Sequence, residues 1–134
     1  MASGRFAHEY RKNAVNGASP LQLVVMLYDG ALRFMEAGKH AMARKDIPKQ
    51  NEALLRAQRI LFELMACLDM DQGGEIATNL MALYTYVVNE LVESNVADSP
   101  DAVDRCIRVM SELRETWVEI EDSLRQGDGV QRAA

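Results

Sequence analysis

The chain has 134 residues and a formal net charge of −5. This length fits one domain with a single hydrophobic core, and the acidic balance argues against a nucleic-acid binder. No apolar run reaches the ~18 residues of a membrane span and the start lacks a signal-peptide pattern, so we expect a cytoplasmic protein with no membrane contact and with Cys67 and Cys106 reduced.

Residues 1–17 show no sustained hydrophobic period and contain several glycines and asparagines, which predicts a flexible N-terminal arm. Phe6 and Tyr10 nevertheless give this arm apolar anchors. Two interpretations stay open. The segment is either a mobile arm with scattered hydrophobic residues, or a cap that covers apolar surface on the body until a partner displaces it.

The pattern at residues 20–44 predicts a helix with more apolar surface than one packing face needs. Ser19 and Gln22 form a capping-box pattern, and Pro20 suits the first helical position. The apolar side chains sweep roughly 260° of this helix, whereas an ordinary surface helix shows a stripe of a little over ~100°. Gly30 and Gly38 lie inside it and suggest close approach by another backbone.

A second helix is predicted at residues 48–68. Its main apolar row consists of Ala53, Ala57, Ile60, Leu61, Leu64 and Leu68. Leu55 and Phe62 stand one heptad apart on another side, and Met65 lies between the two faces. This helix therefore also has surplus apolar surface.

A third helix is predicted at residues 74–95, after a turn at residues 71–74. Its expected core row is Ile76, Leu80, Leu83, Val87 and Leu91. A second row widens the apolar arc to roughly half the helix, and it consists of Ala77, Met81, Tyr84, Val88 and Val92.

A fourth helix is predicted at residues 100–125. One unbroken apolar row runs from Val103 to Leu124, with successive members three or four residues apart. Charged residues occupy the opposite face, so we expect this helix only to close the core. The tail from 126 to 134 is short and contains glycine, which predicts disorder.

Together these segments predict an all-α, antiparallel up-down four-helix bundle over residues 18–125, with a short N-terminal cap segment. Helices adjacent in sequence are adjacent in such a bundle, so the surplus rows of the second and third helices would meet. We predict that a partner helix binds there. The predicted partner-binding residues are Leu55, Phe62, Met65, Met81, Tyr84 and Val88. A distorted bundle that encloses the surplus, or a homodimer, would account for the same pattern.

No catalytic, cofactor-binding or metal-binding pattern accompanies the helices. His8 and His40 are the only histidines, and neither belongs to the Glu-x-x-His motifs of di-metal bundles. Nothing pairs a nucleophile with a base, so we expect neither an enzyme nor a cofactor.

The order and spacing of several short motifs resemble the FliS family of flagellar secretion chaperones. These motifs are Ala18-Ser19-Pro20, Leu27-Tyr28-Asp29-Gly30-Ala31, Gly73-Gly74-Glu75-Ile76-Ala77 with Asn79-Leu80, Leu83-Tyr84 with Tyr86, and Leu113-Arg114 with Trp117. The sequence departs from the family pattern at Leu21-Gln22, Thr85 and Ser94, positions expected on helix surfaces and a cap.

The resemblance implies a cytoplasmic, non-enzymatic chaperone that binds the C-terminal helical segment of flagellin. Such a protein prevents premature flagellin polymerisation and assists delivery to the flagellar type III export gate, whose components are further implied partners. It also implies an N-terminal segment that folds against the body through Tyr10. The expected free state is a monomer or a weak homodimer. The alternative is a structural homodimeric bundle that binds an unrelated amphipathic helix.

Overall fold

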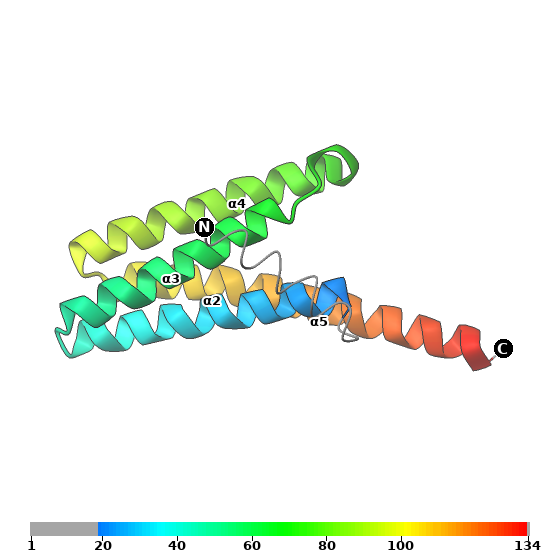
Figure 1. Ribbon diagram of the computed structural model, residues 1–134, viewed down its shortest axis with the longest axis horizontal. Helices are drawn as coiled ribbons and strands as arrows, with labels where there is room; N and C mark the ends of the chain where they lie inside the picture. Colours follow the sequence, from blue (N-terminus) through cyan, green and yellow to red (C-terminus); the bar gives the residue numbers. More distant parts are fainter. Residues whose placement is uncertain (1–18, 134) are drawn as a thin grey trace.

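The structure is a computed structural model that describes the backbone of residues 19–133 and the side chains of residues 19–126. This part of the chain forms four helices and no strand: α2 (Pro20–Ala43), α3 (Ile47–Ala66), α4 (Met70–Ala97) and α5 (Pro100–Ala133). The contacting pairs are α2 with α3, α3 with α4, α4 with α5, and α2 with α5. Successive helices run in opposite directions (Figure 1). The predicted all-α four-helix bundle is confirmed.

Each of the first three helices begins at a capping residue. Its side chain accepts a hydrogen bond from a backbone N–H in the first turn, which has no partner within the helix. Ser19 Oγ accepts the Gln22 N–H at 3.1 Å, and Gln22 Oε1 accepts the Ser19 N–H at 2.8 Å, so the predicted capping box is present. Asp46 caps α3 and Asp69 caps α4 in the same way. Local sequence therefore sets where these helices begin.

The glycines of α2 lie where α3 packs closely against it. A Cβ atom at Gly38 would lie 2.6 Å from Leu54 Cδ2 and 2.9 Å from Leu54 Cγ, and Leu54 is fully buried. A Cβ atom at Gly30 would lie 3.2 Å from Ile60 Cδ1, which is a terminal methyl group. Close packing is thus found at both positions and is tighter at Gly38, but the neighbours are side chains of α3 and not the backbone that the sequence led us to expect.

We expect Gly38→Ala to lower the free energy of unfolding by about 1–2 kcal/mol, because overpacking a rigid core outweighs the gain of about 1 kcal/mol from replacing glycine in a helix. Gly30→Ala is the matched control, since the Ile60 methyl can move by a few tenths of an ångström. Urea unfolding should find Gly30→Ala as stable as the wild type or more stable. Equal stability of the two variants would contradict the tighter contact at Gly38.

The α4 helix begins earlier than predicted, and its predicted core row is fully buried only at Val87 and Leu91. It starts at Met70, with non-helical backbone at Gly74 (φ 51°, ψ −127°), a conformation suited to glycine. Ile76, expected in the core row, is 71% exposed, whereas Ala77 next to it is buried. The prediction is therefore wrong for Ile76: both apolar rows fit a helical period, and the side buried at the start of α4 is that of Ala77.

The α5 helix closes the core only along its first half. Val103, Cys106 and Met110 are buried, but Ile120 and Leu124 are exposed. In Figure 1 this helix extends well past the other three, so its last turns lack a neighbour to cover them. The expectation that α5 only closes the core is therefore wrong for its second half.

The backbone of α5 stays helical as far as Ala133, whereas the sequence predicted a disordered tail from residue 126. No proline interrupts these residues, and glycine weakens a helix without blocking its hydrogen bonds. Among the described residues, no helix combines the length and the apolar character that crossing a membrane requires.

Candidate functional site

Gln50 fixes how α3 and α4 lie side by side. Its buried amide Nε2 donates to Asn95 Oδ1 at 2.9 Å and to Asp98 Oδ1 at 2.8 Å, so the start of α3 lies beside the end of α4. Because the two helices are antiparallel, positions further along α3 lie beside progressively earlier positions of α4. Leu55 is consequently close to the level of Val92, and Met65 to that of Met81.

Both helices of this pair leave large apolar side chains exposed. Leu55 and Phe62 on α3 are 47% and 53% exposed, and Val92 on α4 is 45% exposed. Met65 and Met81 are half-buried between them and the core. We call these five residues the α3–α4 face. Single exposed apolar residues are common on proteins, but clustered ones indicate an interaction surface.

Two of the six predicted partner-binding residues do not belong to this face. Tyr84 is only 2% exposed and Val88 only 8% exposed, and both lie in the hydrophobic core. Their prediction as surface residues is wrong because α4 turns that row inward. Val92, one turn beyond Val88, was not predicted as a partner contact. Val92 belongs to the second apolar row that the sequence analysis found on this helix. The helical period alone did not show which members of that row are buried and which are exposed.

Tyr84 instead forms a buried polar contact at the centre of the bundle. Its hydroxyl is 2.5 Å from that of Tyr28 on α2, and the ring centroids are 6.3 Å apart. Burial raises the pKa of both tyrosines, and the hydrogen bond from Tyr84 partly opposes this rise at Tyr28. Both phenols are therefore protonated and neutral at physiological pH, and they join α2 to α4 across the bundle.

Two further residues connect α5 to α2 near the tyrosine pair. Arg114 forms an ion pair with Asp29, and half-buried Trp117 packs against the core. The Trp117 Nε1 is buried and has no hydrogen-bond partner among the described residues. Many of the short motifs that suggested a family thus lie where α2, α4 and α5 meet, and their residues hold the bundle together.

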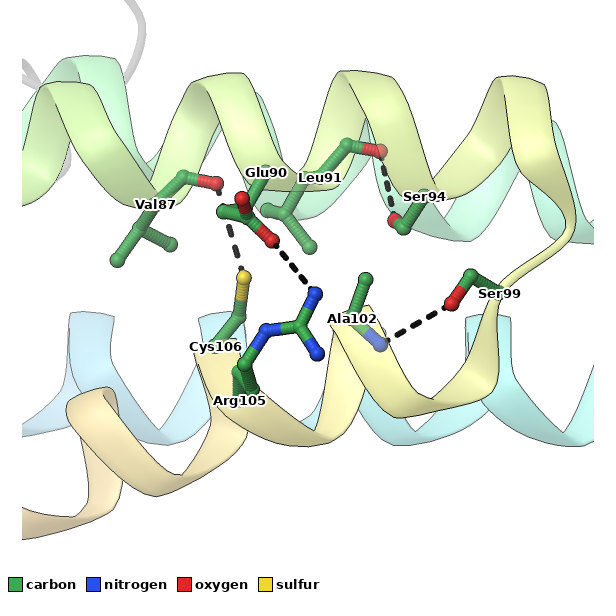
Figure 2. A network of polar contacts seen from close by, with 8 residues as sticks. All are labelled: Val87, Glu90, Leu91, Ser94, Ser99, Ala102, Arg105 and Cys106. Carbon is green, nitrogen blue, oxygen red and sulfur yellow. Dashed lines mark hydrogen bonds and ion pairs between the residues drawn. The ribbon is translucent and has the colours of Figure 1, made fainter.

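Figure 2 shows a polar network that joins α4 to α5. Arg105 donates to Glu90 Oε2 at 3.3 Å, and the Cys106 thiol donates to the Val87 carbonyl at 3.8 Å. Ser94 and Ser99 satisfy backbone groups near the connection between the helices. Burial raises the pKa of Cys106 to about 12, so this thiol is protonated at neutral pH and a poor nucleophile. These contacts support the frame that carries the α3–α4 face.

Within residues 19–126 there is no group of three His, Cys, Asp or Glu side chains that could hold a metal ion. His40 is exposed on α2, and Cys67 is exposed as a free thiol. The predicted cap residues Phe6 and Tyr10 lie outside the described residues. The remaining candidate for function in the described part is surface recognition by apolar side chains.

Comparison with known proteins supports the family that the short sequence motifs suggested. The family described as "Flagellar protein FliS" matches residues 2–124. The "Flagellar secretion chaperone FliS" of Vibrio cholerae is 36% identical over 115 residues, which cover 83% of this chain and 85% of the relative. Its namesake in Salmonella typhimurium is 36% identical over 110 residues, covering 81% and 82%, and that of Bacillus subtilis is 30% identical over 123 residues, covering 90% and 91%.

The match spans nearly the whole chain, and Tyr28 and Tyr84, which belong to two of the motifs, meet in the core. The members named above are chaperones rather than enzymes. The chain therefore belongs to the FliS family of flagellar secretion chaperones.

Proposed function

We propose that this protein binds the C-terminal helical segment of flagellin in the bacterial cytoplasm. Binding prevents premature polymerisation of flagellin and assists its delivery to the flagellar type III export apparatus. The relatives are named flagellar secretion chaperones, which supports an export client for this chain. The observation that carries the proposal is the α3–α4 face, where Leu55, Phe62 and Val92 are each about half exposed.

The chemistry of this face suits an amphipathic helix. Leu55, Phe62 and Val92 would contact the apolar side of a client helix, which is recognised through anchors about one helical turn or one heptad apart. Met65 and Met81 lie beneath them, and methionine side chains adapt their shape to different partners. No nucleotide is needed for such holding. The N-terminal segment with Phe6 and Tyr10 would cover apolar surface until the client binds.

We expect the full-length protein to bind a peptide of the flagellin C-terminal segment in titration calorimetry, with a binding curve that saturates at a defined stoichiometry. The heat capacity change should be negative, because apolar surface is buried and a fluid segment becomes ordered. A peptide of the same composition in scrambled order is the control.

Absence of binding to the native-order peptide would contradict the proposal. Sedimentation of the same protein tests the alternative. A stable dimer that ignores the flagellin peptide would indicate a structural bundle that buries its apolar face against itself.

A further inference from the structure

A second group of exposed apolar side chains lies on the facing sides of α4 and α5. The Cys106 thiol on α5 donates to the Val87 carbonyl on α4, which shows the sides and the level at which these antiparallel helices meet (Figure 2). Ile76 precedes Val87 by about three helical turns, and Trp117 follows Cys106 by about three turns. Ile76 is therefore on the side of α4 that faces α5, near the level of Trp117. Because Ile76 is nevertheless largely exposed, the two helices do not close against each other there.

Two residues of α5 extend this apolar surface. Leu124 follows Cys106 by about five helical turns, so both lie on the same side of α5, and Ile120 precedes Leu124 by about one turn. Both Ile120 and Leu124 are exposed, whereas Trp117 in the same row packs against the core. Figure 1 shows α4 and α5 diverging toward this end of the bundle. We call Ile76, Ile120 and Leu124 the α4–α5 face, and the bundle does not use it for its own packing.

The α4–α5 face is on the other side of α4 from the α3–α4 face. At about 100° per residue, the spacing of Ile76 and Val92 places their side chains about 160° apart around the axis of α4. A molecule bound to one face therefore leaves the other face accessible. The α4–α5 face can thus serve a partner that differs from the client of the α3–α4 face.

The charges around the α4–α5 face are acidic. The α4 helix contains no lysine, arginine or histidine. On α5, Arg114 is the one basic residue between Val109 and Leu124, and it forms an ion pair with Asp29 of α2. Exposed carboxylates adjoin the face on both helices, and they are Glu75, Glu112 and Glu119. A basic partner would therefore meet complementary charge here.

We propose that the α4–α5 face binds a basic amphipathic helix of a second partner protein, one that is not the flagellin client. Apolar residues of that helix, three or four positions apart, cover Ile76, Ile120 and Leu124, and its lysines or arginines face the surrounding carboxylates. The same charges disfavour other occupants. A second copy of this chain would bring carboxylates against carboxylates, and anionic lipids and nucleic acids would be repelled.

Fluorescence anisotropy tests this inference with a labelled peptide that places leucine and lysine at helical spacing. We expect the full-length protein to bind this peptide with a saturating curve, and the affinity should fall as salt is added because the charges are opposite. The same peptide with glutamate at every lysine position should not bind. Failure of the lysine peptide to bind, or equal binding of both peptides, would overturn the proposal.

Substitutions on the two faces assign the binding to one of them. The variant I76S/L124S should bind the lysine peptide about 100-fold more weakly, at about a factor of ten for each apolar anchor lost. Since both side chains are exposed, this variant should unfold at the wild-type urea concentration. The matched control is L55S/F62S on the α3–α4 face, which should bind the lysine peptide like the wild type. Equal affinity of I76S/L124S and the wild type, or a loss in L55S/F62S, would overturn the proposal.

Two further measurements separate this face from the client surface and from self-association. A saturating amount of the flagellin C-terminal peptide should leave the affinity for the lysine peptide unchanged, and displacement would overturn the proposal of a second face. In sedimentation, a wild-type dimer that I76S/L124S dissociates would assign the face to a second copy and would likewise overturn it. Neither measurement requires that flagellin be the client of the α3–α4 face, so the two proposals can fail independently.

Discussion

Replacing Tyr84 with alanine is expected to lower the free energy of unfolding by about 3–5 kcal/mol, as for other large aromatic residues removed from a core. Tyr84 is almost fully buried, and its loss would leave both a cavity and an unpaired Tyr28 hydroxyl. Because small domains are stable by only about 5–15 kcal/mol, the change would be large. Urea unfolding measures it directly.

Tyr86→Ala is the matched control on the same helix. Tyr86 is exposed, so its removal should change the free energy of unfolding by less than about 1 kcal/mol. Comparable losses for Tyr84→Ala and Tyr86→Ala would contradict the position of Tyr84 in the core.

Phenylalanine variants separate the hydroxyl pair from the packing of the rings. Tyr84→Phe leaves the buried Tyr28 hydroxyl without its partner, which costs about 1–3 kcal/mol. Removing both hydroxyls should cost less than the sum of the two single changes, since no polar group then stays unpaired. Additive effects in this double-mutant cycle would mean that the two hydroxyls do not interact.

Much of the fold could be predicted because local signals agreed with one another. The Ser19 capping box, the Pro100 start and the helical period of each segment all indicated four helices, and the structure has them. The glycines of α2 correctly indicated close packing against another helix. These features depend on residues that are close in sequence or that share one face of a helix. A single amino-acid sequence is therefore enough to predict them.

The position of the candidate site could be predicted only in part. Leu55 and Phe62 stood apart from the main row of α3, and both are exposed. On α4 two apolar rows lie side by side, and periodicity alone could not show that Tyr84 points inward to Tyr28 while Ile76 points outward. That choice depends on packing between helices distant in sequence.

The family motifs and the proposed binding surface lie in different parts of the molecule. Tyr28 on α2 bonds to Tyr84 on α4, Asp29 on α2 pairs with Arg114 on α5, and Trp117 packs against the core, so these motif residues join α2, α4 and α5. None of them belongs to the α3–α4 face. Membership of the family therefore indicates how the helices of the bundle are held together. The contacts with a client protein must be tested separately.

Replacing Leu55 and Phe62 together with serine is expected to weaken flagellin binding by about 100-fold. Apolar residues at the centre of an interface each contribute about 1–2 kcal/mol or more, and 1.4 kcal/mol corresponds to a factor of ten. Since both side chains are about half exposed, the free energy of unfolding should change by less than about 1 kcal/mol. Ile120→Ser is the control, because Ile120 is an exposed apolar residue on α5, which packs against α2 and α4.

Titration calorimetry of these variants with the flagellin C-terminal segment tests the role of the α3–α4 face most directly. We predict wild-type affinity for Ile120→Ser and about a hundredth of it for the L55S/F62S variant, with both proteins unfolding at the wild-type urea concentration. Equal affinity of L55S/F62S and the wild type would contradict the assignment of client binding to this face.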